Sequence, residues 1–199
     1  MEKETLFTAV KWEILETLSH GKKSPLEISK ETNSSVSNIS QALRFLELAN
    51  LIKSERITNR DKGKPRVLYS LAQDTAYIIV TAEGLVKKEQ INIDDRKKAF
   101  LRIWLLEYKN LHPYIEKAIQ TLNLEEYDAI MLGKLNLPAI ELYVIQKEPG
   151  TKPKPEEIKH QNIAKKINYI TKTWEEIQEN KDDYYVIHDP LQKMSKDNT

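Results

Sequence analysis

The sequence contains no cysteine, which excludes a disulfide framework, a thiolate metal site and a thiol redox switch. Only five of its 199 residues are glycine, and none belongs to a glycine-rich phosphate loop. No apolar run approaches the roughly 20 residues needed to cross a bilayer. The first ten residues, MEKETLFTAV, have neither a basic region nor an apolar core, so we expect no secretory signal and a cytoplasmic location.

Charge of neither sign is in excess overall, since the formal net charge is +1, but the charges are unevenly placed. Residues 1–70 contain 12 Lys and Arg against 9 Asp and Glu, and residues 50–70 alone contain 6 against 2. Residues 71–199 contain 19 against 21. Positive charge is therefore concentrated in one short segment, as is typical of a surface that contacts phosphate groups.

Just before that segment, NSSVSNISQALRFLELANLI (33–52) has the pattern of a helix with one buried face. Its apolar residues recur at steps of three, four and three, namely Val36, Ile39, Leu43 and Leu46. The opposite side carries short hydroxyls, amides and one arginine, namely Ser37, Asn38, Gln41 and Arg44. Surface helices usually carry Glu and Lys, so this side has the composition of a surface that touches something specific.

Two shorter helices are predicted before this one. The first is LFTAVKWEILETLSHG, and the second starts at SPLEISKET, where Ser24 and Glu27 have the spacing of a capping box. The third helix is expected to end at Asn50, a residue that tolerates left-handed backbone.

A hairpin is predicted next, because two β-prone runs, residues 52–58 and 66–71, flank the polar connection NRDKGKP. The tip of this hairpin is basic, with Arg60, Lys62, Lys64 and Arg66. Three helices followed by a basic hairpin are the order of elements in a winged helix-turn-helix.

The stretches SNISQALRFLELANLIKSER and KGKPRVLYSL resemble the winged-helix regulators of the ArsR/MarR type over roughly residues 8–72. Two positions depart from the family pattern, since Asn50 replaces the usual Gly and Ala42 stands where a His is common. The lack of Cys, and of a His/Asp cluster in these helices, argues against the metal-sensing members. We therefore expect no metal ion and no other cofactor.

The resemblance implies that the third helix enters the major groove of double-stranded DNA and that the hairpin wing contacts phosphates. The residues predicted to bind DNA are Ser35, Ser37, Asn38, Ser40, Gln41, Arg44, Arg60, Lys62, Lys64 and Arg66. The alternative is a winged helix that docks proteins, since a polar helix face is often only a solvated one.

The second half of the chain is predicted to begin with helical structure over residues 91–123. Pro113 implies either one kinked helix or two successive helices. We interpret this segment as a link between domains and a dimer surface, with packing on the C-terminal core as the alternative. Further along, three runs have strand character, YDAIMLG, AIELYVIQKE and DYYVIHD. Between the last two, a long amphipathic helix is predicted from the spacing of Ile163, Ile167, Ile170, Trp174 and Ile177.

The second half of the chain also has an enzymatic interpretation. YDAIMLGKLNLPAIELYVIQKE has the rhythm of a minimal nucleotidyltransferase core, but Gly133 is followed by Lys134 instead of Ser, and the second strand supplies one acid, Glu141. Paired carboxylates are needed to hold Mg²⁺ against a triphosphate, so such a domain would be catalytically silent. The four histidines lie far apart, and His188 and its neighbour Asp189 point to opposite faces of a strand. No catalytic residue is predicted.

These observations predict an α+β protein and not an enzyme. The expected parts are a winged helix-turn-helix domain (1–90), a helical linker or dimerisation segment (91–123), a small α/β dimerisation or sensing domain (124–190) and a disordered tail (191–199). The expected function is transcriptional regulation by a DNA-binding homodimer. An effector of unknown identity would act on the C-terminal domain, and no membrane partner is expected.

Overall fold

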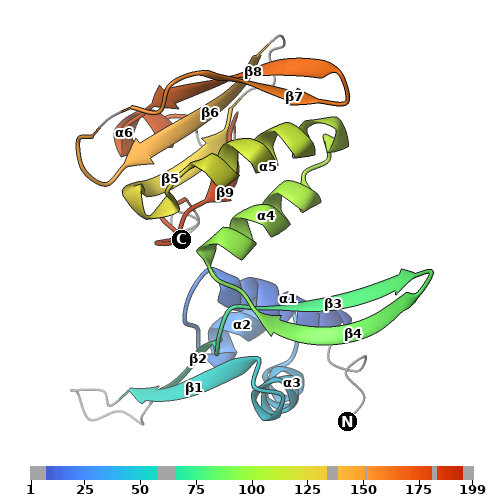
Figure 1. The fold of residues 1–199 in the computed structure, drawn as a ribbon. Helices are drawn as coiled ribbons and strands as arrows, with labels where there is room; N and C mark the ends of the chain where they lie inside the picture. The colour runs from blue at the N-terminus through green and yellow to red at the C-terminus, as the bar shows by residue number, and fades with distance from the viewer. Residues whose placement is uncertain (1–7, 58–65, 134–138, 151, 181–182, 195–199) are drawn as a thin grey trace. The chain divides into compact units, whose positions relative to one another are not determined.

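The computed structural model describes residues 8–57, 66–133, 139–150, 152–180 and 183–194. The chain divides into two compact units, Met1–Asn92 and Ile93–Thr199, which are described separately (Figure 1). No helix among the described residues is both long and apolar enough to cross a membrane. The first unit consists of α1 (Ala9–Ser19), α2 (Pro25–Glu31), α3 (Val36–Leu48), β1 (Ile52–Ile57), β2 (Arg66–Leu71), β3 (Thr75–Ala82) and β4 (Leu85–Asn92).

The core of the first unit lies between its three helices and the first hairpin. Its fully buried side chains come from all three helices and from β1, and they include Ile14, Ile28, Ile39, Leu43, Leu46 and Ile52. β1 and β2 pair antiparallel from Ile52–Leu71 to Ile57–Arg66, as predicted for the wing. Helices followed by this hairpin form a winged helix-turn-helix, which confirms the predicted fold of this part of the chain.

The boundaries of α2 and α3 follow from local hydrogen bonds that the sequence predicts. The Ser24 side chain accepts from the Glu27 N–H, and the Glu27 carboxylate accepts from the Ser24 N–H at 2.7 Å, so the capping box is confirmed. The Ser24 hydroxyl also donates to the Glu27 carboxylate at 2.6 Å, and this hydrogen bond, followed by the one from the Ser24 N–H, holds the pKa of Glu27 below its usual value. After α3, Asn50 adopts a left-handed φ of 55°, again as predicted.

The Ser24 cap gives a first prediction. Ser24→Ala leaves the Glu27 N–H without its side-chain acceptor, and we expect a loss of about 1 kcal/mol in the free energy of unfolding. The pKa of Glu27 should rise towards its ordinary value at the same time, which a carboxylate NMR titration would measure. Ser19→Ala serves as the control, because its hydroxyl donates to the Glu16 carbonyl at the exposed end of α1. A Glu27 pKa that does not move would contradict the assigned role of Ser24.

A second hairpin follows the wing, over residues 75–92. β3 and β4 pair antiparallel from Thr75–Asn92 to Ala82–Leu85 and form a separate two-stranded sheet. The turn between them contains Gly84 with a φ of 75°, a conformation that glycine adopts without strain. Tyr77 packs against the core of the first unit.

The second unit consists of a mixed sheet with helices on both of its faces. Its elements are α4 (Asp95–Leu105), α5 (His112–Thr121), β5 (Tyr127–Leu132), β6 (Ala139–Gln146), β7 (Glu156–His160), β8 (Ile163–Thr171), α6 (Trp174–Gln178) and β9 (Tyr185–His188). The described strands form a five-stranded sheet in the order β7-β8-β6-β5-β9. β6 and β8 pair parallel, and the other neighbours pair antiparallel.

The two faces of this sheet are covered by different helices (Figure 1). On one face, Ile130 and Leu132 of β5 belong to the larger core, together with residues of α4 and α5. On the other face, Ala129 and Met131 pack with Ile177 of α6. Successive residues of a strand point to opposite faces, so the apolar run from Ala129 to Leu132 of β5 is explained by burial on both sides.

The segment predicted to be helical, residues 91–123, begins with the last two residues of β4, and its two helices α4 and α5 belong to the second unit. Pro113 lies in the first turn of α5, where its missing N–H costs no helical hydrogen bond, so two successive helices replace the alternative of one kinked helix. Ala99 and Ile103 of α4, and Ile115 of α5, are fully buried in the core of this unit.

The long helix predicted across Ile163–Ile177 is wrong. β7 and β8 occupy most of that stretch, and α6 spans only Trp174–Gln178. The strands are joined by Gln161 and Asn162, whose φ values of 45° and 63° are those of a tight hairpin turn. Ile163, Ile167 and Ile170 lie on β8, which pairs with β6 on one side and β7 on the other. The α+β class is confirmed nevertheless.

Candidate nucleic-acid interface

The outward side of α3 carries a stripe of polar side chains. Ile39, Leu43 and Leu46 are buried on the inward side. The opposite side carries the outward stripe, which consists of Ser37, Gln41 and Arg44 at intervals of about one helical turn. All three side chains of the stripe are exposed. Asn38 is exposed beside it. The structure therefore brings four of the predicted residues together on one accessible surface.

Two other predicted residues of α3 make hydrogen bonds within the helix. The Ser35 Oγ accepts from the Asn38 N–H at 3.2 Å and caps the helix. The half-buried Ser40 donates its hydroxyl to the Val36 carbonyl at 2.7 Å. Ser35 is exposed, and its capping hydrogen bond fixes the first turn of α3. The Ser40 hydroxyl already donates its hydrogen to the Val36 carbonyl.

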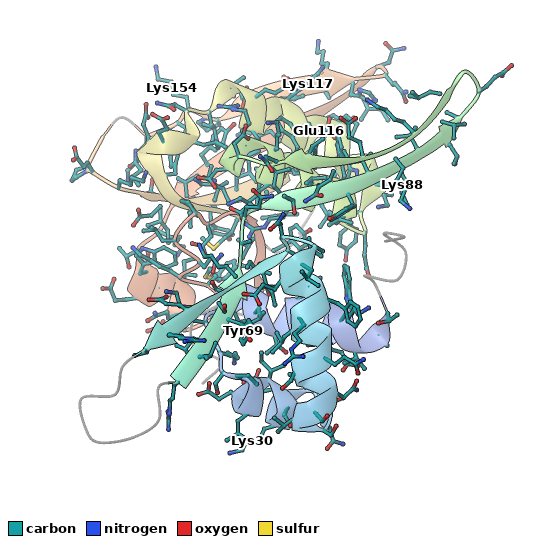
Figure 2. The ribbon with its side chains drawn as sticks, turned by 90° about the horizontal axis from the view of Figure 1, so that it is seen from below. Lys30, Tyr69, Lys88, Glu116, Lys117 and Lys154 are labelled. Carbon is teal, nitrogen blue, oxygen red and sulfur yellow. The ribbon has the colours of Figure 1, made fainter. Side chains whose placement is uncertain are left out.

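The single acid of α3 is turned away from this stripe. Glu47 is half-buried and accepts from the Ser54 hydroxyl at 2.6 Å, so its carboxylate is held against β1. Tyr69 of β2 lies between the hairpin and α3 (Figure 2), and burial, followed by the nearby Glu47 charge, raises the pKa of its hydroxyl. The outward stripe thus presents an arginine, an amide and a hydroxyl, without a carboxylate among them.

The wing is attached firmly at its base. The Lys23 N–H donates to the Tyr69 carbonyl at 3.0 Å, and the Tyr69 N–H donates back at 2.8 Å. The Lys22 ammonium forms an ion pair with Glu55 of β1, and this contact lowers the pKa of the Glu55 carboxyl. Arg66, at the start of β2, is exposed. Arg60, Lys62 and Lys64 lie outside the described residues.

Sequence reasoning missed Arg56. It lies on β1 opposite Val67, and it shares a strand face with Ile52 and Ser54, the face that packs towards α3. The side chain is exposed, so it carries positive charge on the same side of the hairpin as the helix. Successive residues of a strand alternate between its two faces, so Arg56 lies on the same face as the buried Ile52, and this alternation would have identified it.

The nucleotidyltransferase-like residues have structural partners in the second unit. A Cβ on Gly133 would lie 1.8 Å from Cε2 of Tyr143, so the glycine makes room for that ring. The Tyr143 hydroxyl donates to the Glu141 carboxylate at 2.8 Å. Within the described parts of the chain, no group of three or more His, Cys, Asp or Glu residues is placed to hold a metal ion.

Comparison with known families identifies the same segment. Residues 10–54 match the family described as bacterial regulatory protein, arsR family. The matched residues run from α1 into β1 and include all of α2 and α3. No curated protein matches the chain. The match confirms the resemblance to ArsR-type helix-turn-helix regulators in the N-terminal part, and it supports a DNA-binding transcriptional regulator.

Proposed function

We propose that the protein is a homodimeric regulator that reads DNA with α3 in the major groove. The observation that carries this proposal is the exposed stripe of Ser37, Gln41 and Arg44, from which the acid of α3 is turned away. Arg can pair with both acceptors of guanine, and Gln with adenine. A carboxylate in this stripe would repel the phosphates that line the groove, and the stripe contains none.

The wing supplies the contacts that do not depend on sequence. Arg66 and Arg56 are exposed on the strands of the hairpin, and Arg60, Lys62 and Lys64 fall in the connection between the strands. Phosphate contacts of this kind fix the register of a protein on the duplex and provide much of its affinity.

Dimerisation is proposed through the segment 91–123. The end of α4 and the residues after it expose Trp104, Leu105 and Tyr108, and Leu105 has 76% of its surface accessible. Exposed apolar side chains that lie close together are typical of association surfaces. Two copies would supply two recognition helices for the half-sites of an imperfect palindrome.

A second candidate, protein docking, is favoured by a specific observation. α3 also exposes apolar side chains, namely Val36, Phe45 and Leu48, and the last has 76% of its surface accessible. The Lys11 ammonium lies 5.0 Å from the centre of the Phe45 ring. Apolar side chains on this face would fit a protein partner as well as thymine methyl groups.

The salt dependence of binding to random genomic duplex separates the two candidates. We expect a steep linear fall of log K with log salt for the full-length protein. A variant with Lys62, Lys64 and Arg66 all replaced by alanine should have a slope smaller by about 3 per wing, because each lost phosphate contact changes the slope by about 0.9.

The matched control removes the same charge from the other unit. Lys152, Lys154 and Lys166 are exposed on the C-terminal unit, and their triple alanine variant should retain the slope of the unaltered protein. Absence of duplex binding at low salt would reject DNA binding and leave the docking module. An equal change of slope in both triple variants would reject the wing as the phosphate contact.

A further inference from the structure

The hairpin of β3 and β4 is a two-stranded sheet that none of the other described strands extends (Figure 1). No residue of either strand is fully buried, and Tyr77 packs against the core of the first unit. A two-stranded hairpin is marginally stable in water by itself, whereas a sheet of three or more strands with an apolar face is stable. This hairpin would therefore gain stability from a further strand at one of its edges.

The two edges of the hairpin differ in charge. β4 carries Lys87, Lys88 and Glu89, and the first and last of these form an ion pair. β3, with the sequence TAYIIVTA, has no charged side chain. Charged residues on an edge strand oppose pairing with another chain, and their absence permits it. The edge of β3 is therefore the one that is open to a further strand.

The other described edge strands are charged or short. β1, β2 and β7 each contain at least one lysine, arginine or glutamate. β9 has no lysine, arginine, aspartate or glutamate but spans only 4 residues, whereas β3 spans 8. A long uncharged edge is a template for another strand, so β3 differs from the other edges in the property that governs association.

The sequence of β3 is nearly symmetric about Ile79, which points to a second copy as the partner strand. Antiparallel pairing of two copies centred on this residue gives the pairs Ile79–Ile79, Ile78–Val80, Tyr77–Thr81 and Ala76–Ala82. Pairs of β-branched residues, and of an aromatic with a β-branched residue, are favourable when they lie directly opposite each other. No pair in this register brings two charges together.

The same register brings together an apolar side chain that is now exposed. Ile79 has 67% of its surface accessible, and Val86 of β4 has 81%. Ile79 lies opposite Lys88 and Val86 lies opposite Thr81, so the two apolar side chains share one face of the hairpin. Pairing through β3 would place the Ile79 side chains of both copies side by side and remove them from water.

We propose that β3 pairs antiparallel with β3 of a second copy, centred on Ile79, in a four-stranded sheet of order β4-β3-β3-β4. The contact is isologous and closes at two copies. It extends the homodimer proposed above and rests on that part of the proposed function, but it does not depend on DNA binding.

The test uses the absence of cysteine, because one introduced thiol then reports one contact. In the proposed register, the Cβ atoms at position 79 of the two copies lie about 4.5–5.5 Å apart. A disulfide joins Cβ atoms about 3.5–4.5 Å apart, a separation that small strand movements reach. Mild oxidation of full-length Ile79→Cys without DNA should therefore give a covalent dimer on a non-reducing gel.

Two matched variants separate pairing from random collision. Val86→Cys places the thiol at a more exposed position on the other strand, where collision alone would link it at least as fast. Thr81→Cys is on the same face of β3, but in the proposed register it is offset from its counterpart by four residues, about 13 Å. Ile79→Cys should link about tenfold faster than both. A control that links as fast as Ile79→Cys would overturn the proposal.

Charge at position 79 provides a second test, read by sedimentation equilibrium. Ile79→Glu and Ile79→Lys each place like charges opposite one another across the two copies, and each should raise the dimer Kd about tenfold. Glu at this position also faces Lys88 of its own chain, so the hairpin itself should not be weakened. An equimolar mixture of the two variants should associate more tightly than either alone. A mixture that associates no better would overturn the register.

Sedimentation of the unaltered protein distinguishes failure of this contact from failure of the homodimer. A dimer whose Ile79→Cys variant does not link would overturn the β3 contact and leave dimerisation through segment 91–123 standing. A monomer at every concentration would overturn both. The salt dependence of duplex binding tests the DNA-binding function separately from either result.

Discussion

Arg44→Ala is expected to abolish most of the preference for a selected operator over a scrambled duplex. A guanidinium that donates two parallel hydrogen bonds to guanine contributes about 1–3 kcal/mol of discrimination in each half-site. Arg44 is the one cationic side chain on the outward stripe of α3, so its neighbours Ser37 and Gln41 cannot replace it. The affinity for scrambled duplex should fall much less. Competition binding at one fixed salt concentration measures both quantities.

Arg44→Lys provides the sharpest control, because it keeps the positive charge and removes the planar pair of donors. We expect this variant to bind scrambled duplex as the unaltered protein does, and yet to lose most of the discrimination. If Arg44→Ala weakens binding to all duplexes equally, as the triple wing variant should, then Arg44 contacts phosphate and the division of roles between helix and wing is wrong.

The second large effect is expected from Gly133→Ala. The new Cβ would lie 1.8 Å from Cε2 and 2.6 Å from Cδ2 of Tyr143, so the ring must move. The ring is held by its hydrogen bond to Glu141 and by edge-on packing against Tyr184 at 5.3 Å between centroids. Burial, together with the Glu141 carboxylate, raises the pKa of Tyr143 to about 12, so the hydroxyl remains a donor at neutral pH. We expect a loss of about 1–3 kcal/mol in the free energy of unfolding of the second unit.

Gly150→Ala is the matched substitution, since a Cβ there would meet nothing closer than 3.7 Å. It should change stability by less than about 0.5 kcal/mol. Urea denaturation of both variants, followed by tryptophan fluorescence, makes the comparison. Equal stabilities would show that the Tyr143 ring moves aside at little cost. Truncating the ring in Gly133→Ala/Tyr143→Ala should recover part of the loss caused by the clash.

The first unit was largely predictable because its boundaries depend on local chemistry. The capping box at Ser24 requires only a hydroxyl and a carboxylate three residues apart. The left-handed backbone at Asn50 requires only a residue type that tolerates it. The matched family segment, residues 10–54, covers the same elements. Arg56 was missed because the face that it occupies is identified only once Ile52 is known to be buried, and that burial depends on packing against the helices.

The second unit was less predictable because its sheet depends on pairing between distant strands. Ile163, Ile167 and Ile170 suit a helix by spacing, but β8 lies between β6 and β7 and satisfies its backbone groups there. Tertiary pairing overrode the periodicity, and the turn at Gln161 and Asn162 interrupts the stretch before β8. Within the candidate interface, the hydrogen bond that occupies the Ser40 hydroxyl was equally invisible from residue type alone.

The strand order of the second unit has a consequence for synthesis on the ribosome. β9 is the last strand of its sheet in the sequence, yet it pairs with β5, the first, through Ile130 and His188. The first unit ends at Asn92 and has a hydrophobic core of its own, so it can fold while translation continues. The edge of β5 stays open until β9 has left the exit tunnel. A nascent chain can therefore hold a folded winged helix-turn-helix before β9 has joined the sheet of the second unit.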